Sequence, residues 1–89
     1  MISQTTESFR KLYDQLPPQI QVSAKKVFEK WQSNPLHPSI RFKQVHPSKP
    51  IYSVRINRGW RALGIKEDET LIWFWIGSHT DYKKTISKI

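Results

Sequence analysis

The sequence predicts an α+β fold: an N-terminal helical hairpin packs on a three- to four-stranded antiparallel β-sheet, and a short C-terminal helix follows the last strand. Apolar residues recur at helical spacing over residues 9–31, with a proline pair between the two runs. Apolar and polar residues then alternate as in a strand with one buried face. A length of 89 residues allows one modest core, so we expect residues 1–89 to form a single domain.

Two helices are predicted in the first third of the chain. The first has Thr5 or Thr6 available as N-cap and stops at Pro17-Pro18. Pro18 suits the first turn of the second helix, where a backbone N–H has no intrahelical partner. That helix ends near residues 33–35. The two apolar stripes, which together should cover the sheet, are Phe9, Leu12, Tyr13 and Leu16, then Ile20, Ala24, Val27, Phe28 and Trp31.

The strands follow in a part of the chain punctuated by prolines and tight turns. A short candidate strand lies between prolines, and a cleanly alternating one comes after it. Asn57-Arg58-Gly59 is a three-residue hairpin connection in which the glycine would adopt a left-handed conformation. Residues 67–69 form the next turn. The four predicted strands are residues 40–45, 51–56, 60–66 and 70–77.

The last strand and the segment after it complete the fold. Residues 71–76 are apolar without alternation, which predicts a strand that is central in the sheet and covered by the helical hairpin. Ser78-His79-Thr80-Asp81 then matches the capping-box pattern of a helix start. We therefore expect a terminal helix over residues 82–89.

Positive charge is concentrated in the middle of the chain. The net charge is +8, and the segment from residue 41 to residue 66 holds seven cations and no carboxylate. A clustered positive face of this kind is typical of proteins that bind a polyanion, and we interpret it as an RNA-handling surface. For any single cation the alternative is a solvated charged face. The seven are Arg41, Lys43, Lys49, Arg55, Arg58, Arg61 and Lys66.

Several classes of protein are disfavoured by the composition. There is no cysteine, so disulfides, thiol nucleophiles and cysteine-based zinc sites are excluded. The three histidines lie far apart in sequence, and we expect neither a metal site nor a cofactor. The N-terminus does not resemble a signal peptide, and the longest apolar run is far shorter than the roughly 20 residues that span a bilayer. We expect a cytoplasmic protein.

An ordered set of motifs runs through residues 9–84. Residues 16–20 join the helices, Asn34-Pro35 closes the second helix, and Phe42-Lys43 precedes the strands. The set continues with Tyr52-Ser53-Val54-Arg55-Ile56, Gly59-Trp60-Arg61-Ala62-Leu63 and Trp75-Ile76-Gly77-Ser78-His79-Thr80-Asp81-Tyr82. In this order the motifs resemble the RelE/ParE toxin superfamily of bacterial type II toxin–antitoxin systems.

The resemblance also shows where this chain differs from the family. The family usually opens with a β-strand before the first helix, a part that only residues 1–4 could play here. Ser53 and Arg55 stand where the RelE pattern tends to place lysines. The closing Gly77-Ser78-His79 looks more like the YafQ branch, in which such a histidine is catalytic.

The resemblance implies a toxin that cleaves messenger RNA as a metal-independent endoribonuclease, on or near the ribosome, and so inhibits translation. It further implies a cognate acidic antitoxin and a toxin–antitoxin hetero-oligomer. Two alternatives remain open. One is a ParE-like toxin that inhibits DNA gyrase by binding, and the other is a basic RNA-binding module without catalysis.

Four residues are candidates for catalysis. RNA cleavage without a metal requires removal of the 2′-OH proton, neutralisation of the phosphorane and protonation of the leaving 5′-oxygen. Arg55 and Arg61 flank the predicted hairpin turn and could grip one phosphate. His79 follows the last strand at a helix start and could transfer protons, or it could be a structural capping residue. Tyr82, three residues on, could assist, stack on a base or be buried against the sheet.

A second group of residues is expected to bind RNA around that centre. Lys43 and His46 flank the expected groove and could steer the substrate or act as a base. Arg58 in the turn is either a substrate contact or solvent-exposed, and Trp60 could stack on a base. Trp73 and Trp75 are expected in the core, and His37 in loop structure. The RNA-binding candidates are Lys43, His46, Lys49, Arg58 and Trp60.

Overall fold

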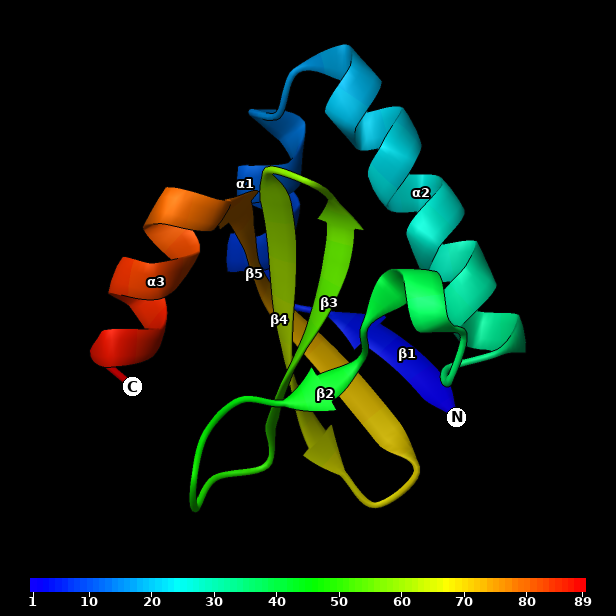
Figure 1. The fold of residues 1–89 in the computed structure, drawn as a ribbon, viewed down its shortest axis with the longest axis vertical. Coiled ribbons are helices and arrows are strands. Elements are labelled where there is room, and N and C mark those ends of the chain that lie inside the picture. Colours follow the sequence, from blue (N-terminus) through cyan, green and yellow to red (C-terminus); the bar gives the residue numbers. More distant parts are fainter.

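The computed structural model describes all residues from Met1 to Ile89 and confirms the α+β class. Three α-helices and one 3-10 helix accompany a five-stranded sheet (Figure 1). The elements in chain order are β1 (Ile2–Thr5), α1 (Glu7–Asp14), α2 (Pro18–Ser33), η1 (Pro38–Ile40), β2 (Lys43–Gln44), β3 (Ile51–Asn57), β4 (Trp60–Glu67), β5 (Thr70–Ser78) and α3 (His79–Ser87).

The helix boundaries follow the predicted signals. Thr6 is the N-cap of α1, and its side chain accepts a hydrogen bond from the Phe9 N–H. Pro18 opens α2. Ser78 caps α3 by accepting from the Asp81 N–H, so this helix begins at His79, three residues before the predicted start.

The sheet is larger than predicted. Its strand order is β1-β5-β4-β3-β2, and β1 runs parallel to β5, whereas all other neighbours are antiparallel. The expectation of three to four antiparallel strands was therefore wrong in its count and at one edge. The candidate strand at residues 40–45 is reduced to the two residues of β2, because η1 occupies the preceding positions.

Strand β5 lies inside the sheet as predicted, and its lack of alternation has a structural cause. Leu63 pairs with Trp75 and Gly64 pairs with Trp73, so Phe74 is the extra residue of a β-bulge. The bulge moves the buried positions of β5 out of strict alternation. Leu71, Trp73 and Ile76 all join the core with at most 1% exposure.

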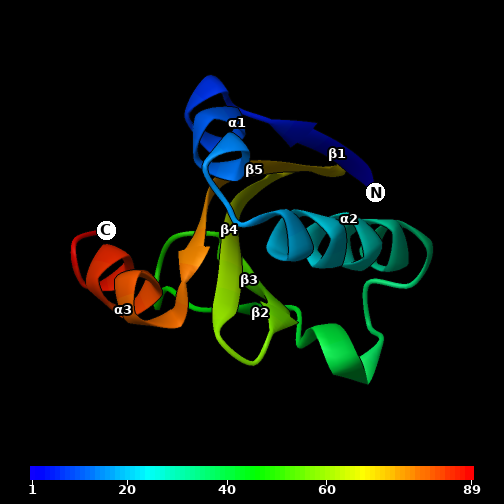
Figure 2. The ribbon, with the colours of Figure 1, turned by 90° about the horizontal axis from the view of Figure 1, so that it is seen from above.

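The core lies between α1, α2 and one face of the sheet. Trp31 of α2 packs edge-on against Trp73 of β5, with ring centroids 5.4 Å apart. On β3 and β4 the core face comprises Val54, Ile56 and Ala62. Helices α2 and α3 lie on opposite sides of strands β3 and β4 (Figure 2), so α3 faces the side that the core does not use.

The backbone conformation of the β3–β4 turn differs from the prediction. Gly59 in the β3–β4 turn does not have a positive φ, contrary to the prediction. The left-handed positions are Asp68 in the β4–β5 turn, with φ 53°, and Arg41 between η1 and β2, with φ 48°. None of the helices combines the length and the apolar character that a membrane span requires.

Candidate active site

Arg55 and Arg61 stand directly opposite each other on β3 and β4. Their neighbours Val54 and Ala62 are fully buried in the core. Side chains alternate across a strand, so both arginines project from the face away from α1 and α2. The register of β3 and β4 confirms the prediction that the hairpin brings these two cations together.

Helix α3 brings two more candidates to the same face. The His79 N–H donates to the Gly59 carbonyl oxygen over 2.8 Å, which ties the start of α3 to the β3–β4 turn. The Tyr82 ring stacks on the His79 ring at a centroid distance of 5.7 Å. It also contacts the half-buried Trp75, at 6.5 Å, so Trp75 lies on this face and not in the core cluster.

These elements enclose a pocket of about 220 Å³, here called the cationic pocket. Four of its seven lining side chains are Lys or Arg, and none is a carboxylate. The one ion pair in the molecule, Glu7–Lys11, lies elsewhere, on α1. The positive charge of the pocket is therefore not compensated from within the chain. The lining residues are Arg41, Lys43, Ser53, Arg55, Arg61, His79 and Tyr82.

Arg61 is held in place by the turn that precedes it. Its Nη1 donates to the carbonyl oxygens of Asn57, at 2.6 Å, and Trp60, at 2.9 Å. The other guanidinium nitrogens have no protein partner and can donate to an anion. Burial, followed by the positive charge of Arg55, lowers the pKa of Arg61, while the Tyr82 phenol acts in the opposite direction. An arginine remains charged under these conditions, so its position favours an anionic ligand.

The pKa of His79 is lowered by its surroundings in the pocket. Partial burial lowers its pKa below the usual value for histidine, and the positive charges of Arg61 and Lys83 lower it further. These effects favour the neutral imidazole, in which one ring nitrogen can accept a proton.

Ser53 forms part of the pocket wall between β2 and β4. It pairs with Lys43 of β2 and Leu63 of β4, and its side chain is almost fully buried. Its Oγ lies 3.5 Å from the Tyr82 hydroxyl, at the limit of a hydrogen bond. The Tyr82 hydroxyl therefore lies beside β3.

The other RNA-binding candidates lie outside the cationic pocket. His46 Nδ1 accepts the N–H groups of Ser48 and Lys49, and its Nε2 lies 3.1 Å from the Ile89 carbonyl oxygen. His46 thus connects the β2–β3 loop to Ile89, which follows α3. Arg58 lies in the β3–β4 turn, and Trp60 packs partly against the core. Of the five RNA-binding candidates, Lys43 alone lines the pocket.

Sequence reasoning did not assign Arg41 and Ser53 to the site. Ser53 could have been found from alternation, since it lies two residues before Arg55 on the same face of β3. Arg41 was counted among the cations, but its approach to the pocket depends on the turn after η1, which has no clear sequence signal.

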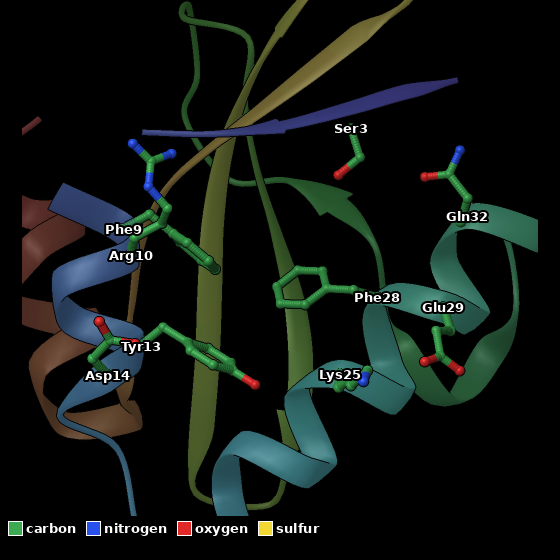
Figure 3. Close-up of a pocket in the computed structure, with 9 residues that line it drawn as sticks. All are labelled: Ser3, Phe9, Arg10, Tyr13, Asp14, Lys25, Phe28, Glu29 and Gln32. Atoms are coloured by element: carbon green, nitrogen blue, oxygen red, sulfur yellow. The ribbon is translucent and has the colours of Figure 1, made fainter. Parts of the chain in front are cut away.

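Two larger cavities lie apart from the cationic pocket. One, of about 410 Å³, separates α1 from α3 and includes Trp60 and Trp75. The other, of about 600 Å³, opens between α1 and α2 beside β1, where Phe9, Tyr13 and Phe28 point into the gap (Figure 3). Its charged residues are of both signs, unlike those of the cationic pocket. No group of three or more His, Asp or Glu side chains gathers anywhere in the molecule in a way that could hold a metal ion.

Comparison with known families decides the affiliation of the chain. Residues 18–84 match the model of the ParE-like toxin domain, which is most of the sequence. The chain belongs to the ParE-like toxin family. This confirms the resemblance to the RelE/ParE toxin superfamily that the motifs suggested.

Solved structures of toxins share the fold of this family member. The RelB–RelE complex from Methanococcus jannaschii matches at a TM-score of 0.75 and 18% identity, over 92% of this chain and 96% of the other. YafQ from E. coli matches at 0.73 and 14%, over 90% and 94%. The RelBE2 toxin–antitoxin complex from Mycobacterium tuberculosis matches at 0.70 and 21%, over 88% and 96%. No curated protein sequence matches the chain.

Proposed function

We propose that this ParE-like toxin is a metal-independent endoribonuclease that cleaves messenger RNA on or near the ribosome and thereby inhibits translation. The observation that carries the proposal is the meeting of Arg55, Arg61, His79 and Tyr82 in one cationic pocket. These side chains come from two strands and a helix that are separated in sequence. Together they offer anion binding and proton transfer within reach of one phosphate.

The proposed chemistry assigns a role to each side chain. Neutral His79 accepts the proton of the ribose 2′-OH, and the 2′-oxygen attacks the adjacent phosphorus. Arg61 and Arg55 stabilise the charge that develops on the phosphorane. The bond from phosphorus to the 5′-oxygen breaks, and the Tyr82 hydroxyl donates a proton to that oxygen. The products are a 2′,3′-cyclic phosphate and a 5′-hydroxyl, and solvent carries the proton from His79 back to Tyr82.

The proposal includes a cytoplasmic antitoxin partner that covers the basic face. Solved structures with this fold include toxin–antitoxin complexes from M. jannaschii, M. tuberculosis and E. coli. An acidic segment of such a partner would bind Arg55, Arg58 and Arg61 and close the cationic pocket. Lys43, Lys49, Arg58 and Trp60 remain the proposed contacts to the flanking RNA, with Lys43 the nearest to the catalytic residues. His46 is left out of this set, because its ring nitrogens are engaged by backbone groups of the chain.

A second candidate function follows from the family match itself. The matching model is that of ParE-like toxins, and a ParE-like toxin can act by binding DNA gyrase without cleaving nucleic acid. In that case the pocket would be a binding surface, and His79 would have no chemical role.

One experiment separates the two candidates. The protein is induced in bacteria, new 5′ ends are mapped on transcripts, and plasmid supercoiling is measured in the same cultures. The nuclease proposal predicts new transcript ends with unchanged supercoiling. Growth arrest with loss of supercoiling and no new ends would favour gyrase inhibition, and RNA binding without either effect would leave only a binding module.

A further inference from the structure

Arg41 has an unusual backbone conformation for its residue type. Its φ of 48° and ψ of 46° place it in the left-handed region, where the Cβ atom meets the following carbonyl oxygen and glycine or asparagine is favoured. Its side chain is exposed and forms no ion pair. A turn alone would be better served by glycine, so the side chain needs an explanation of its own.

The residues on either side of Arg41 are both packed against the core. Ile40 is 1% exposed in the core. Phe42 stacks on Tyr52 at 4.9 Å and packs edge-on against Trp31 at 5.7 Å. With both neighbours anchored in the core, Arg41 is held at one place on the surface.

That place is in line with the two arginines of the sheet. Arg41 comes two residues before Lys43, which pairs with Ser53, and Arg55 comes two residues after Ser53. Arg55 in turn pairs with Arg61. Arg41 lines the cationic pocket with both, and its charge contributes to the lowered pKa of Arg61. Three guanidinium groups therefore follow one another across β4, β3 and the chain before β2.

We propose that Arg41 binds the RNA phosphate adjacent to the scissile one, and that its left-handed backbone is retained to aim the side chain at this phosphate. The inference rests on the proposed RNA cleavage and adds a contact to the substrate backbone. As a binding residue, Arg41 should affect affinity and its dependence on salt more than the rate of the chemical step.

The test uses a short 2′-O-methyl RNA of mixed sequence, which can bind but has no free 2′-OH for cleavage. Binding is measured over a series of salt concentrations for the wild type, Arg41→Gly, Arg41→Asn and Arg41→Lys, together with thermal melting. Asp68→Gly is the control for backbone strain. Asp68 is the other non-glycine residue in a left-handed conformation, with φ 53°, and it lies at the opposite end of β4 from Arg61. Lys26→Ala on α2 is the control for loss of one exposed cation.

We expect Arg41→Gly to bind about tenfold more weakly and to reduce the slope of log affinity against log salt by about 0.7, the value for one single-strand phosphate contact. Arg41→Asn should do the same, and Arg41→Lys should keep the slope. Both glycine variants should melt at a higher temperature than the wild type, while Asp68→Gly and Lys26→Ala leave the slope unchanged.

Two results would overturn the inference while leaving the proposed function intact. One is an unchanged slope in Arg41→Gly and Arg41→Asn, and the other is a lower melting temperature in Arg41→Gly alone, which would make Arg41 a structural residue. If the wild type bound this RNA but cleaved no transcript, the nuclease proposal would fail and the slope would still decide the role of Arg41. A wild type that binds no RNA would overturn both.

Discussion

His79 and Arg61 are both fixed by hydrogen bonds to backbone carbonyl groups in and beside the β3–β4 turn. The His79 N–H donates to the Gly59 carbonyl, and Arg61 donates to the carbonyls of Asn57 and Trp60. Neither contact uses the imidazole or the free guanidinium nitrogens. The turn therefore holds both groups in place while their reactive atoms remain available to a ligand.

Replacing either residue should remove activity without unfolding the protein. We expect His79→Ala to lower the cleavage rate about 10²- to 10⁴-fold, the usual contribution of a general acid or base. Arg61→Ala should cost about 10²- to 10³-fold, because a donor to the transition-state charge is lost. Both should abolish growth inhibition at equal expression, with circular dichroism and melting curves close to those of the wild type. Full toxicity of both variants would refute the assignment.

The lowered pKa of His79 makes a directional prediction for pH. A general base works in its neutral form, so cleavage should increase as the pH rises through a midpoint below the ordinary histidine pKa of about 6.5. Lys83→Ala removes one of the charges that lower this pKa, so the midpoint should move to higher pH. NMR titration of the His79 ring measures this directly. Lys84 lines the cavity on the other side of α3. Lys84→Ala is therefore the matched control and should leave the midpoint unchanged.

Much of the site could be predicted from individual residues. A hairpin turn and a capping box fix the neighbourhood of Arg55, Arg61, His79 and Tyr82 locally, so their proximity could be predicted, and the structure brings all four to one pocket. His46 was assigned to RNA binding from its charge type, but its ring is occupied by three backbone groups. Hydrogen bonds between the β2–β3 loop and the chain end 43 residues later have no local sequence signal.

Helix α3 carries two of the four catalytic candidates but has no buried residue of its own. Its attachments include the Ser78 cap, the His79 N–H bond to the turn and the contact of Tyr82 with Trp75. Few buried contacts predict local opening at a free energy well below that of global unfolding. The geometry of the pocket is therefore sensitive to small changes at the start of this helix.

The two helix caps provide a paired test of that sensitivity. Removing an N-cap hydroxyl typically costs about 1 kcal/mol. Ser78→Ala should speed amide hydrogen exchange in α3 and reduce RNA cleavage, because His79 and Tyr82 lose their fixed position. Thr6→Ala removes the equivalent cap of α1 and should destabilise that helix with little effect on cleavage. Equal cleavage by the two variants would show that α3 does not position the catalytic groups.

Some features of the sheet could be predicted from the sequence pattern and others could not. The hairpin of β3 and β4 was predicted nearly to its ends because alternation and the turn agree. Strand β1 was not predicted, since its four residues are all exposed and pair with β5 through the backbone. The bulge at Phe74 was also not visible, because an apolar run without alternation looks the same with or without an inserted residue.

The clustering of positive charge in one part of the molecule destabilises its folded state. Of the net charge of +8, the segment from residue 41 to residue 66 contributes +7, and four of its cations share the pocket without a carboxylate. Like charges at close range destabilise the folded state unless a ligand neutralises them. A polyanion that binds the folded state should therefore stabilise the protein as well as occupy its site.

An acidic antitoxin should depend on this face of the molecule. We expect the product of the neighbouring gene to bind with an affinity that falls as salt rises. Replacing Arg55, Arg58 and Arg61 together by Ala should weaken binding at least tenfold. The matched control removes three exposed cations from α2, as Lys25→Ala, Lys26→Ala and Lys30→Ala, and should have a much smaller effect. Unchanged affinity in the first triple variant would place neutralisation on another surface.

The chemistry of the cut ends tests the catalytic assignment most directly. Attack by the 2′-oxygen leaves a 5′-hydroxyl on the downstream fragment, so transcripts from cells that express the wild type can be sequenced by a method selective for 5′-hydroxyl ends. We predict new 5′-hydroxyl ends that coincide with growth arrest and are absent when His79→Ala or Arg61→Ala is expressed at the same level. Ends that carry a 5′-phosphate, or 5′-hydroxyl ends that persist in both variants, would contradict cleavage by the cationic pocket.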